Sequence, residues 1–517
     1  METTLLLILL AGPAFPQSRG PLPALKQAES YLRQQQYRPA ATLLQQVLKK
    51  SPRNPLAQNL MGLALTGLGK PEEANIHFQA AVKSNPKFYP AWKNLALNEL
   101  AMRRWEEARG HFQQVLTYAP DDAVAHLSLG EIHYMQREFG PAVDEYLKSE
   151  GLFLRDPRLV LNFARSCFES NQPQKAAGAL EILGPEADGQ AHFQAGLMLA
   201  QMEKYAAAAH QFELATKDYP DPYEAGFNLT LAYVRSQNYS AAIQAAQKLI
   251  AQNYRNAELY NLLAEAYEHN NQTIEAYNAL RTATQLDPKD ENNYLDLMAL
   301  GVDHANYELA LDIANIALNN IPNSFRLIMQ RGAVLAFQGR LTPALEDFDR
   351  AAQLDPQSNL PYFAMCMAPM QTAQVPRALE ILRKRLAARP DDYLLLYALG
   401  ESADRSAGSG LVSQDEALRA LEKSVQANPN LSTSRIALGR IYLRRNEVDL
   451  AIPQLQRALE LDPTDLSPCY QLAQAYLRKG DKQRAEDLMA KFTKFRDEDR
   501  ERHINRNLLK LLREGEK

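Results

Sequence analysis

The chain has few cysteines and little net charge. Its 517 residues include three cysteines, Cys167, Cys366 and Cys469, which lie far apart and form no CxxC pair. An odd number of widely spaced cysteines argues against a disulfide framework and a zinc site, and we interpret all three as small buried hydrophobic residues. The net charge of −4 and the pI near 6.2 provide no bulk attraction for nucleic acid or for an anionic membrane.

Motifs of catalysis and metal binding are also missing. The chain has no HExxH sequence, and Ala64 stands where a phosphate-binding loop ending in Gly69 and Lys70 needs a glycine. His126 and His133 share a helical face, and such a pair is one possible metal site. Both occupy positions that we expect in the core, so packed histidines are the favoured interpretation. We therefore predict a protein that is not an enzyme, with no catalytic residues, no metal and no cofactor.

A short apolar run stands near the N-terminus. Residues Leu5 to Ala11 are apolar, and Pro13 and Pro16 follow them. The run is too short to span a bilayer but typical of a secretory signal peptide, with cleavage after Ala14. We predict a signal peptide at residues 1–17 and export to the periplasm or the extracellular space. The alternative is a cytoplasmic protein with a frayed or misassigned N-terminus, because no Lys or Arg precedes the run.

The chain is rich, however, in one repeated pattern. Its length makes a single globular core unlikely to suffice, and 46% hydrophobic and 23% charged residues are typical of a folded protein. An alanine recurs in the second helix of each predicted helix pair, and we call these residues the anchors. The anchors are Ala40, Ala74, Ala108, Ala142, Ala176, Ala208, Ala242, Ala276, Ala310, Ala344, Ala378, Ala417, Ala451 and Ala485. Nearly all neighbouring anchors are 34 residues apart.

Other residues keep phase with the anchors. A small residue such as Gly62 or Gly332 precedes the anchor by twelve positions in many repeats, and a large apolar residue such as Phe78 follows it by four. The small side chain lets two helices approach closely. Glycine or asparagine stands between the paired helices, where a left-handed stop is needed. These residues are Gly69, Asn171, Asn271, Gly339, Asn446 and Gly480. A proline usually ends each repeat.

This pattern resembles the tetratricopeptide repeat family, whose unit is a 34-residue helix–turn–helix. The resemblance covers residues 21–496 in about fourteen units. It implies an all-α fold, an α-solenoid wound into a right-handed superhelix. The first helix of each unit would line most of its concave groove.

Two departures from the period suggest how the array is divided. Repeats 1–4 span residues 21–156, and a degenerate fifth repeat follows at 157–188, where Gly184 and Pro185 end the second helix early. This repeat is a candidate joint. Repeats 6–14 span 189–496 with a loop insertion near 406–413. Residues 497–517 are predicted to form a C-terminal capping helix and tail, with a partner-binding helix as the alternative.

The candidate binding residues lie fourteen positions before each anchor, where the first helix should face the groove. They are Asn94, Ser128, Asn162, Gln194, Asn228, Leu262, Asp296 and Gln330. Side-chain amides can hydrogen-bond the backbone of an extended peptide whatever its sequence. Acidic first-helix residues follow in the middle of the array, and Arg440 and Arg444 belong to a basic C-terminal end. A solvated helix surface is the alternative interpretation of these charges.

The sequence thus predicts a non-catalytic scaffold that binds a protein or an extended peptide. No nucleic-acid partner and no transmembrane span are expected. Two alternatives remain, a cytosolic adaptor or co-chaperone and the substrate-recognition subunit of an enzyme complex. Crosslinking in native cells would identify the partner.

Overall fold

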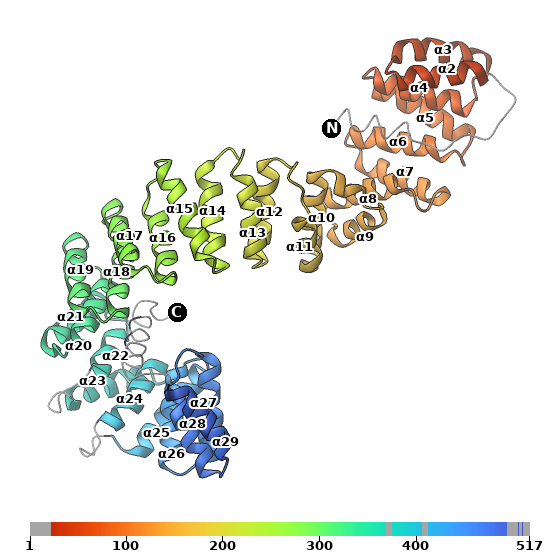
Figure 1. Ribbon diagram of the computed structural model, residues 1–517. Coiled ribbons are helices and arrows are strands. Elements are labelled where there is room, and N and C mark those ends of the chain that lie inside the picture. Colours follow the sequence, from red (N-terminus) through yellow and green to blue (C-terminus); the bar gives the residue numbers. More distant parts are fainter. Residues whose placement is uncertain (1–21, 369–374, 406–411, 494–504, 506–508, 510–517) are drawn as a thin grey trace. The chain divides into compact units, whose positions relative to one another are not determined.

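The computed structural model describes residues 22–368, 375–405, 412–493, 505 and 509. These residues form 28 α-helices and one short 3-10 helix, Leu152–Arg155, with no strand among them (Figure 1). The all-α prediction is confirmed. None of the helices in the described ranges is long and apolar enough to cross a membrane. The predicted signal peptide, most of the 406–413 insertion and most of residues 497–517 lie outside the described residues.

The helices alternate as first and second helices of fourteen repeats, as the period predicts. The first helices are α2 (Leu22–Arg33), α4 (Pro55–Gly67), α6 (Tyr89–Ala101), α8 (Ala123–Met135), α10 (Pro157–Glu169), α12 (Gly189–Gln201), α14 (Pro222–Arg235), α16 (Ala257–His269), α18 (Glu291–Asp303), α20 (Phe325–Phe337), α22 (Leu360–Met367), α24 (Tyr393–Arg405), α26 (Ser432–Arg444) and α28 (Ser467–Arg478). The second helices are α3 (Tyr37–Lys50), α5 (Pro71–Ser84), α7 (Trp105–Tyr118), α9 (Phe139–Lys148), α11 (Pro173–Glu181), α13 (Tyr205–Ala215), α15 (Tyr239–Ala251), α17 (Thr273–Leu286), α19 (Tyr307–Asn320), α21 (Leu341–Leu354), α23 (Val375–Ala388), α25 (Gln414–Ala427), α27 (Val448–Leu461) and α29 (Lys482–Thr493).

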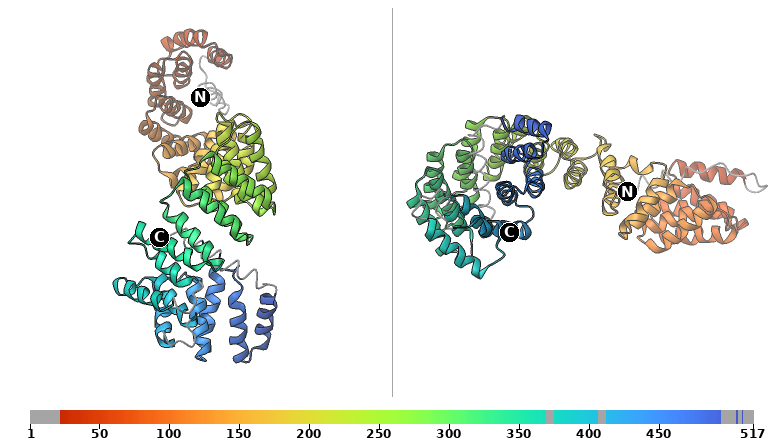
Figure 2. Two further views of the ribbon diagram at one scale, coloured as in Figure 1. Left: turned by 90° about the vertical axis from the view of Figure 1, so that its left-hand side faces the viewer. Right: turned by 90° about the horizontal axis from the view of Figure 1, so that it is seen from below.

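The chain divides into two units, residues 1–245 and 246–517. Within each unit, consecutive helices pack against each other, as α26 to α29 do in the second unit (Figure 2). The degenerate fifth repeat lies inside the first unit, and α11 ends at Glu181, before Gly184. A continuous buried core runs through this repeat from Ala142 to Ala232. The candidate joint at the fifth repeat is therefore not a boundary in the structure.

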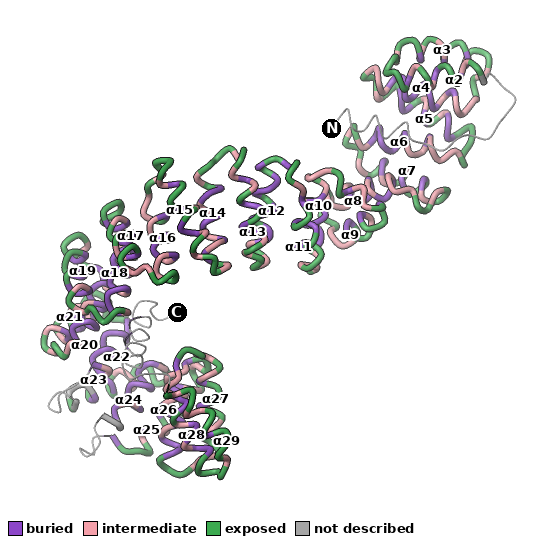
Figure 3. Tube along the Cα trace, in the orientation of Figure 1, coloured by how far each residue is buried: buried purple, intermediate pink, exposed green. Residues whose placement is uncertain are grey.

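Most helices contain a stripe of buried residues beside exposed ones (Figure 3). The anchors belong to this stripe, since every anchor with a described side chain is at most 2% exposed. The glycine twelve residues before an anchor faces the large residue four after it. A Cβ on Gly62 would lie 2.4 Å from Cε1 of Phe78, and one on Gly332 would lie 2.7 Å from Cε1 of Phe348. These glycines are required because an aromatic ring takes the space of their missing side chain.

The turn between paired helices is left-handed in nearly every repeat. Gly69, Asn171 and Gly339 adopt φ values of 73°, 60° and 71°, which confirms the sequence prediction. The same repeat position has positive φ even where the sequence offers neither glycine nor asparagine. These positions are Gln35, Arg103, Arg137, Glu203, Gln237 and Ala305. The packing of the helix pair therefore imposes this conformation even on residues that favour it little.

Polar residues start many of the first helices. Asn54 accepts a hydrogen bond from the Ala57 amide at 3.0 Å, and Asp122 does the same for Ala125. Each satisfies one of the free N–H groups at a helix start. Comparable caps occur at Asp156, Asp188, Asp221, Asn256, Asp290 and Ser324. These caps reinforce the repeat boundaries.

Candidate functional site

Two of the candidate amides in the first unit bond to neighbouring first helices. Asn94 on α6 is 4% exposed, and its Nδ2 donates to Oδ1 of Asn59 on α4 at 2.9 Å. Asn162 on α10 is half-buried and donates to Oε1 of Glu131 on α8 at 3.0 Å. Ser128, at the equivalent position of α8, is also buried. These amides join successive repeats.

Two other candidate amides of the first unit lie closer to solvent. Gln194 on α12 is exposed. Asn228 on α14 is half-buried, and its Nδ2 donates to the Glu224 carbonyl of the same helix at 2.9 Å. This local bond can be exchanged for a bond to a ligand without separating two helices. Gln194 and Asn228 are therefore the accessible ones among the candidate amides of the first unit.

In the second unit, the candidate positions have three different environments. Leu262 on α16 is buried, and Asp296 on α18 is half-buried. Gln330 on α20 is 4% exposed, and its Nε2 donates to the backbone carbonyl of Leu509 at 2.7 Å. Gln330 thus contacts the backbone of a segment 179 residues further along the chain.

The contact between Gln330 and Leu509 was not foreseen from the sequence. Leu509 and Asn505 are both helical and buried. Asn505 Nδ2 donates to the hydroxyl of Tyr307, the first residue of α19, at 3.0 Å. Sequence reasoning treated residues 497–517 as a cap of the last repeat, whereas these two bonds go to the ninth and tenth repeats. The available signal was the four-residue spacing of Asn505 and Leu509, which places both on one helical face.

The candidate basic residues of the C-terminal repeats differ in exposure. Arg440 on α26 forms an ion pair with Glu401 on α24, so it links two first helices. Arg444, at the end of α26, is exposed. Among the acidic residues of the middle repeats, Glu268 contacts His304 with 2.9 Å between Oε1 and Nε2. Several of these charges therefore join neighbouring repeats.

The two histidines that share a helical face have separate carboxylate partners. His126 Nδ1 lies 2.6 Å from Oε2 of Glu145, and His133 Nδ1 lies 2.5 Å from Oε2 of Glu138. Burial alone would raise the pKa of Glu145, but hydrogen bonds from His126 and Lys148 bring it below its ordinary value. Within the described ranges, no three His, Cys, Asp or Glu side chains come together as a metal site would require.

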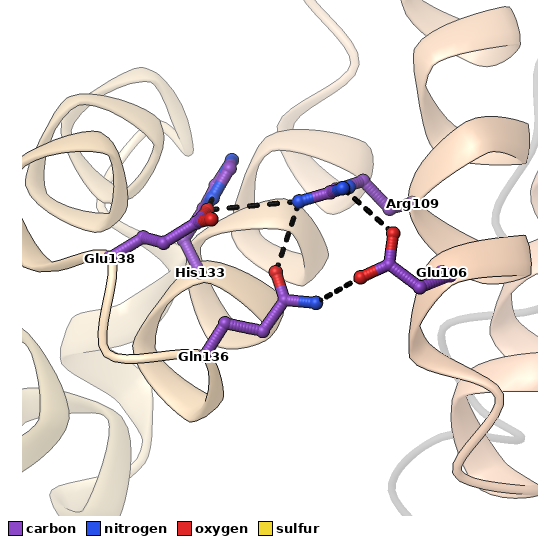
Figure 4. A network of polar contacts seen from close by, with 5 residues as sticks. All are labelled: Glu106, Arg109, His133, Gln136 and Glu138. Carbon is purple, nitrogen blue, oxygen red and sulfur yellow. Dashed lines mark hydrogen bonds and ion pairs between the residues drawn. The ribbon is translucent and has the colours of Figure 1, made fainter.

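His133 belongs to a polar network that connects the third and fourth repeats (Figure 4). Arg109 on α7 contacts Glu106 at 2.7 Å and donates to Oε1 of Gln136 at 3.1 Å. Gln136 in turn donates to Glu106 at 2.5 Å. The bond from Gln136 to Glu106 recurs at the same repeat positions elsewhere. The equivalent pairs are Gln338 with Glu308, Arg445 with Asp415, and Lys479 with Asp449. This network is a connection between repeats, with no feature that assigns it to a ligand.

Comparison with known sequences identifies the repeat. A sequence model described as a tetratricopeptide repeat matches residues 25–87, 93–157 and 227–291. Two related models, described as a TPR repeat and a tetratricopeptide repeat, match residues 439–480 and 466–499. Anaphase-promoting complex subunit 3 of Schizosaccharomyces pombe is 24% identical over 190 residues, which are 36% of this chain and 29% of that protein. The chain therefore matches less than a third of that relative's length.

Solved structures resemble the chain at low sequence identity. Yeast Tom70 is 16% identical with a TM-score of 0.43, over 82% of this chain and 96% of that one. The APC/C hetero-tetramer Cut9-Hcn1 is also 16% identical with a TM-score of 0.36, over 94% of this chain and 95% of that one.

Proposed function

Because the chain belongs to the tetratricopeptide repeat family, we propose that it is a non-catalytic scaffold that binds a protein or an extended peptide. The ligand lies along the faces of the first helices. The observation that carries this proposal is the recurrence of side-chain amides at one repeat position, with Gln194 and Asn228 accessible in the first unit. An amide at this position reaches backbone groups, as the bond from Gln330 to the Leu509 carbonyl illustrates.

The side-chain amides are suited to a ligand that is recognised mainly through its backbone. A glutamine or asparagine side chain both donates and accepts, and so matches the N–H and C=O groups of an extended chain. Each such hydrogen bond contributes about 0.5–1.5 kcal/mol net. Two amides acting together would change the affinity by roughly tenfold. Sequence preference then comes from neighbouring side chains.

The test uses a random 12-residue peptide library selected on the full-length protein. The affinity of the best peptide is measured by fluorescence anisotropy for the wild type and for the double variant Gln194→Ala with Asn228→Ala. We expect the double variant to bind about tenfold more weakly, because both accessible amides are removed.

Asn94→Ala provides the matched control. Its amide is already bonded to Asn59, so this variant should lower the thermal stability and leave the peptide affinity within twofold. A selected peptide whose affinity is the same for the wild type and the double variant would contradict binding at these positions, provided that circular dichroism reports an intact fold.

We also propose that the protein is exported. The support is the apolar run from Leu5 to Ala11, with small residues and prolines after it. In native cells, the mature protein should begin near Phe15 and resist external protease only while the outer envelope is intact. Recovery of an uncleaved N-terminus in the cytosolic fraction would instead favour the cytosolic adaptor.

A further inference from the structure

Gln330 is buried, whereas the residue at the same position of the sixth repeat is exposed. Gln194 occupies the same position in the sixth repeat and is exposed, whereas Gln330 is 4% exposed. The bond from Gln330 goes to the carbonyl of Leu509, and the nearby bond to Tyr307 comes from Asn505. Both partners belong to the C-terminal segment. Asn505 and Leu509 therefore contact the ninth and tenth repeats on the face where the family resemblance places ligands.

We propose that the face containing Tyr307 and Gln330 binds an amphipathic helix, and that the C-terminal segment occupies this face as an intramolecular ligand. A partner helix with an amide side chain and a leucine four residues later would compete for the same place. This inference deepens the proposed function and rests on it, because it names the ligand class for the second unit.

The contacts specify a helix with defined chemistry. Asn505 and Leu509 are both helical and buried, and they contact α19 and α20 through the Asn505 side chain and the Leu509 backbone carbonyl. The face offers one hydroxyl acceptor at Tyr307 and one amide donor at Gln330. Beside them, the rings of Tyr307 and Phe337 lie 6.1 Å apart between centroids. Leu509 is 6% exposed, so its apolar side chain is shielded from water as the anchor residues of a helix-in-groove ligand are.

Because the segment is covalently attached to the repeats, it can occupy this face even with a low intrinsic affinity. A ligand attached to its own receptor has an effective concentration on the order of 1 mM. If the attached segment itself binds the face with a Kd of about 10 µM, a separate helix would bind the self-occupied face about 100-fold more weakly than the vacant one. The C-terminal segment would thus compete with other ligands for this face. Only a partner that binds more tightly, or is present at a higher concentration, would displace it.

The test adds the segment as a separate peptide. A fluorescent peptide with the sequence of residues 497–513 is titrated with the full-length wild type and with full-length Leu509→Asp. The aspartate places a charge in the buried contact, so the variant's own segment should leave the face. We expect the variant to bind the peptide at least tenfold more tightly than the wild type. Adding Gln330→Ala should then weaken peptide binding about threefold.

Two controls separate specific binding from damage to the fold. Asn505→Ala removes the bond to Tyr307 without adding a charge and should change peptide binding in the same direction as Leu509→Asp. Gln194→Ala, at the same repeat position in the first unit, should have no effect on this peptide.

Equal affinities for the wild type, Leu509→Asp and Asn505→Ala would overturn the inference. So would tight binding that Gln330→Ala leaves unchanged. The proposed function has an independent test, because the library peptide depends on Gln194 and Asn228. If that peptide binds as expected and the 497–513 peptide does not, only the present inference fails.

Discussion

At the scale of single residues, the repeat dictates identity where two helices come closest. Gly332 on α20 has no room for a methyl group, because the Phe348 ring on α21 fills the space. Gly110 on α7 is also inside a helix, but an added Cβ there would meet no atom within 4 Å. The same residue type is thus required at one position and incidental at the other.

We therefore expect opposite effects from two alanine substitutions. Gly332→Ala should lower the free energy of unfolding by about 1–3 kcal/mol, because the ring must move in a packed core. Gly110→Ala should raise it by about 0.5–1 kcal/mol through better helix propensity. Urea unfolding followed by circular dichroism measures both. A stabilised Gly332→Ala would show that the core relaxes easily.

At the scale of helices, the ion pairs that join one helix to another differ in how deeply they are buried. Arg331 on α20 donates to both carboxylate oxygens of Asp347 on α21, at 2.8 and 2.6 Å. It also donates to Asn315 on α19 at 3.0 Å, so one guanidinium connects three helices. Asp347 is 4% exposed. By contrast, the Lys479–Asp449 pair has an Asp449 side chain that is 82% exposed.

Asp347→Ala should destabilise the protein by about 2 kcal/mol, since it leaves the Arg331 charge without its carboxylate. Water still reaches part of the Arg331 side chain, which is 24% exposed, and this solvation limits the loss. Asp449→Ala should cost no more than about 0.5 kcal/mol. Thermal unfolding of the two variants beside the wild type gives the comparison. Equal losses of stability in the two variants would mean that burial does not determine how much these ion pairs contribute.

At the scale of the whole molecule, the reactivity of the three buried cysteines can show whether the two units unfold separately. Cys167 lies in the first unit, and Cys366 and Cys469 lie in the second. Burial raises the pKa of the Cys167 thiol to about 11 and also raises that of Cys469. Because stability in a repeat array is a sum of local terms, distant repeats need not open together.

All three thiols should react slowly with a maleimide at pH 8 and rapidly in 6 M guanidinium. For Cys167, the thiolate fraction at pH 8 is about 100-fold below that of a thiol with a pKa of 9.0. Along a denaturant series, mass spectrometry should detect Cys167 and Cys469 becoming reactive at different concentrations. Simultaneous labelling throughout the series would indicate that the chain unfolds as one cooperative unit.

The local parts of the fold were predictable because contacts within a repeat recur with its period. The anchors, the close approach at Gly62 and the turns at Gly69 and Asn171 were all read from the sequence. Positive φ at Ala305 was not, because its cause is the packing of the helix pair and not the residue's own preference. The boundary between the two units, after residue 245, was not predicted either. The sequence departs from the period at the fifth repeat instead, and the buried core continues through that repeat.

By itself, the sequence determined the all-α class, the number of repeats and the residues at each repeat position. Only the tertiary structure decided which of the equivalent amides is available. Asn94 is bonded to the preceding first helix, Gln194 is exposed, and Gln330 is covered by Leu509. The physical reason is that a 34-residue period encodes contacts between neighbouring helices, whereas a contact across 179 residues leaves no periodic trace in the sequence.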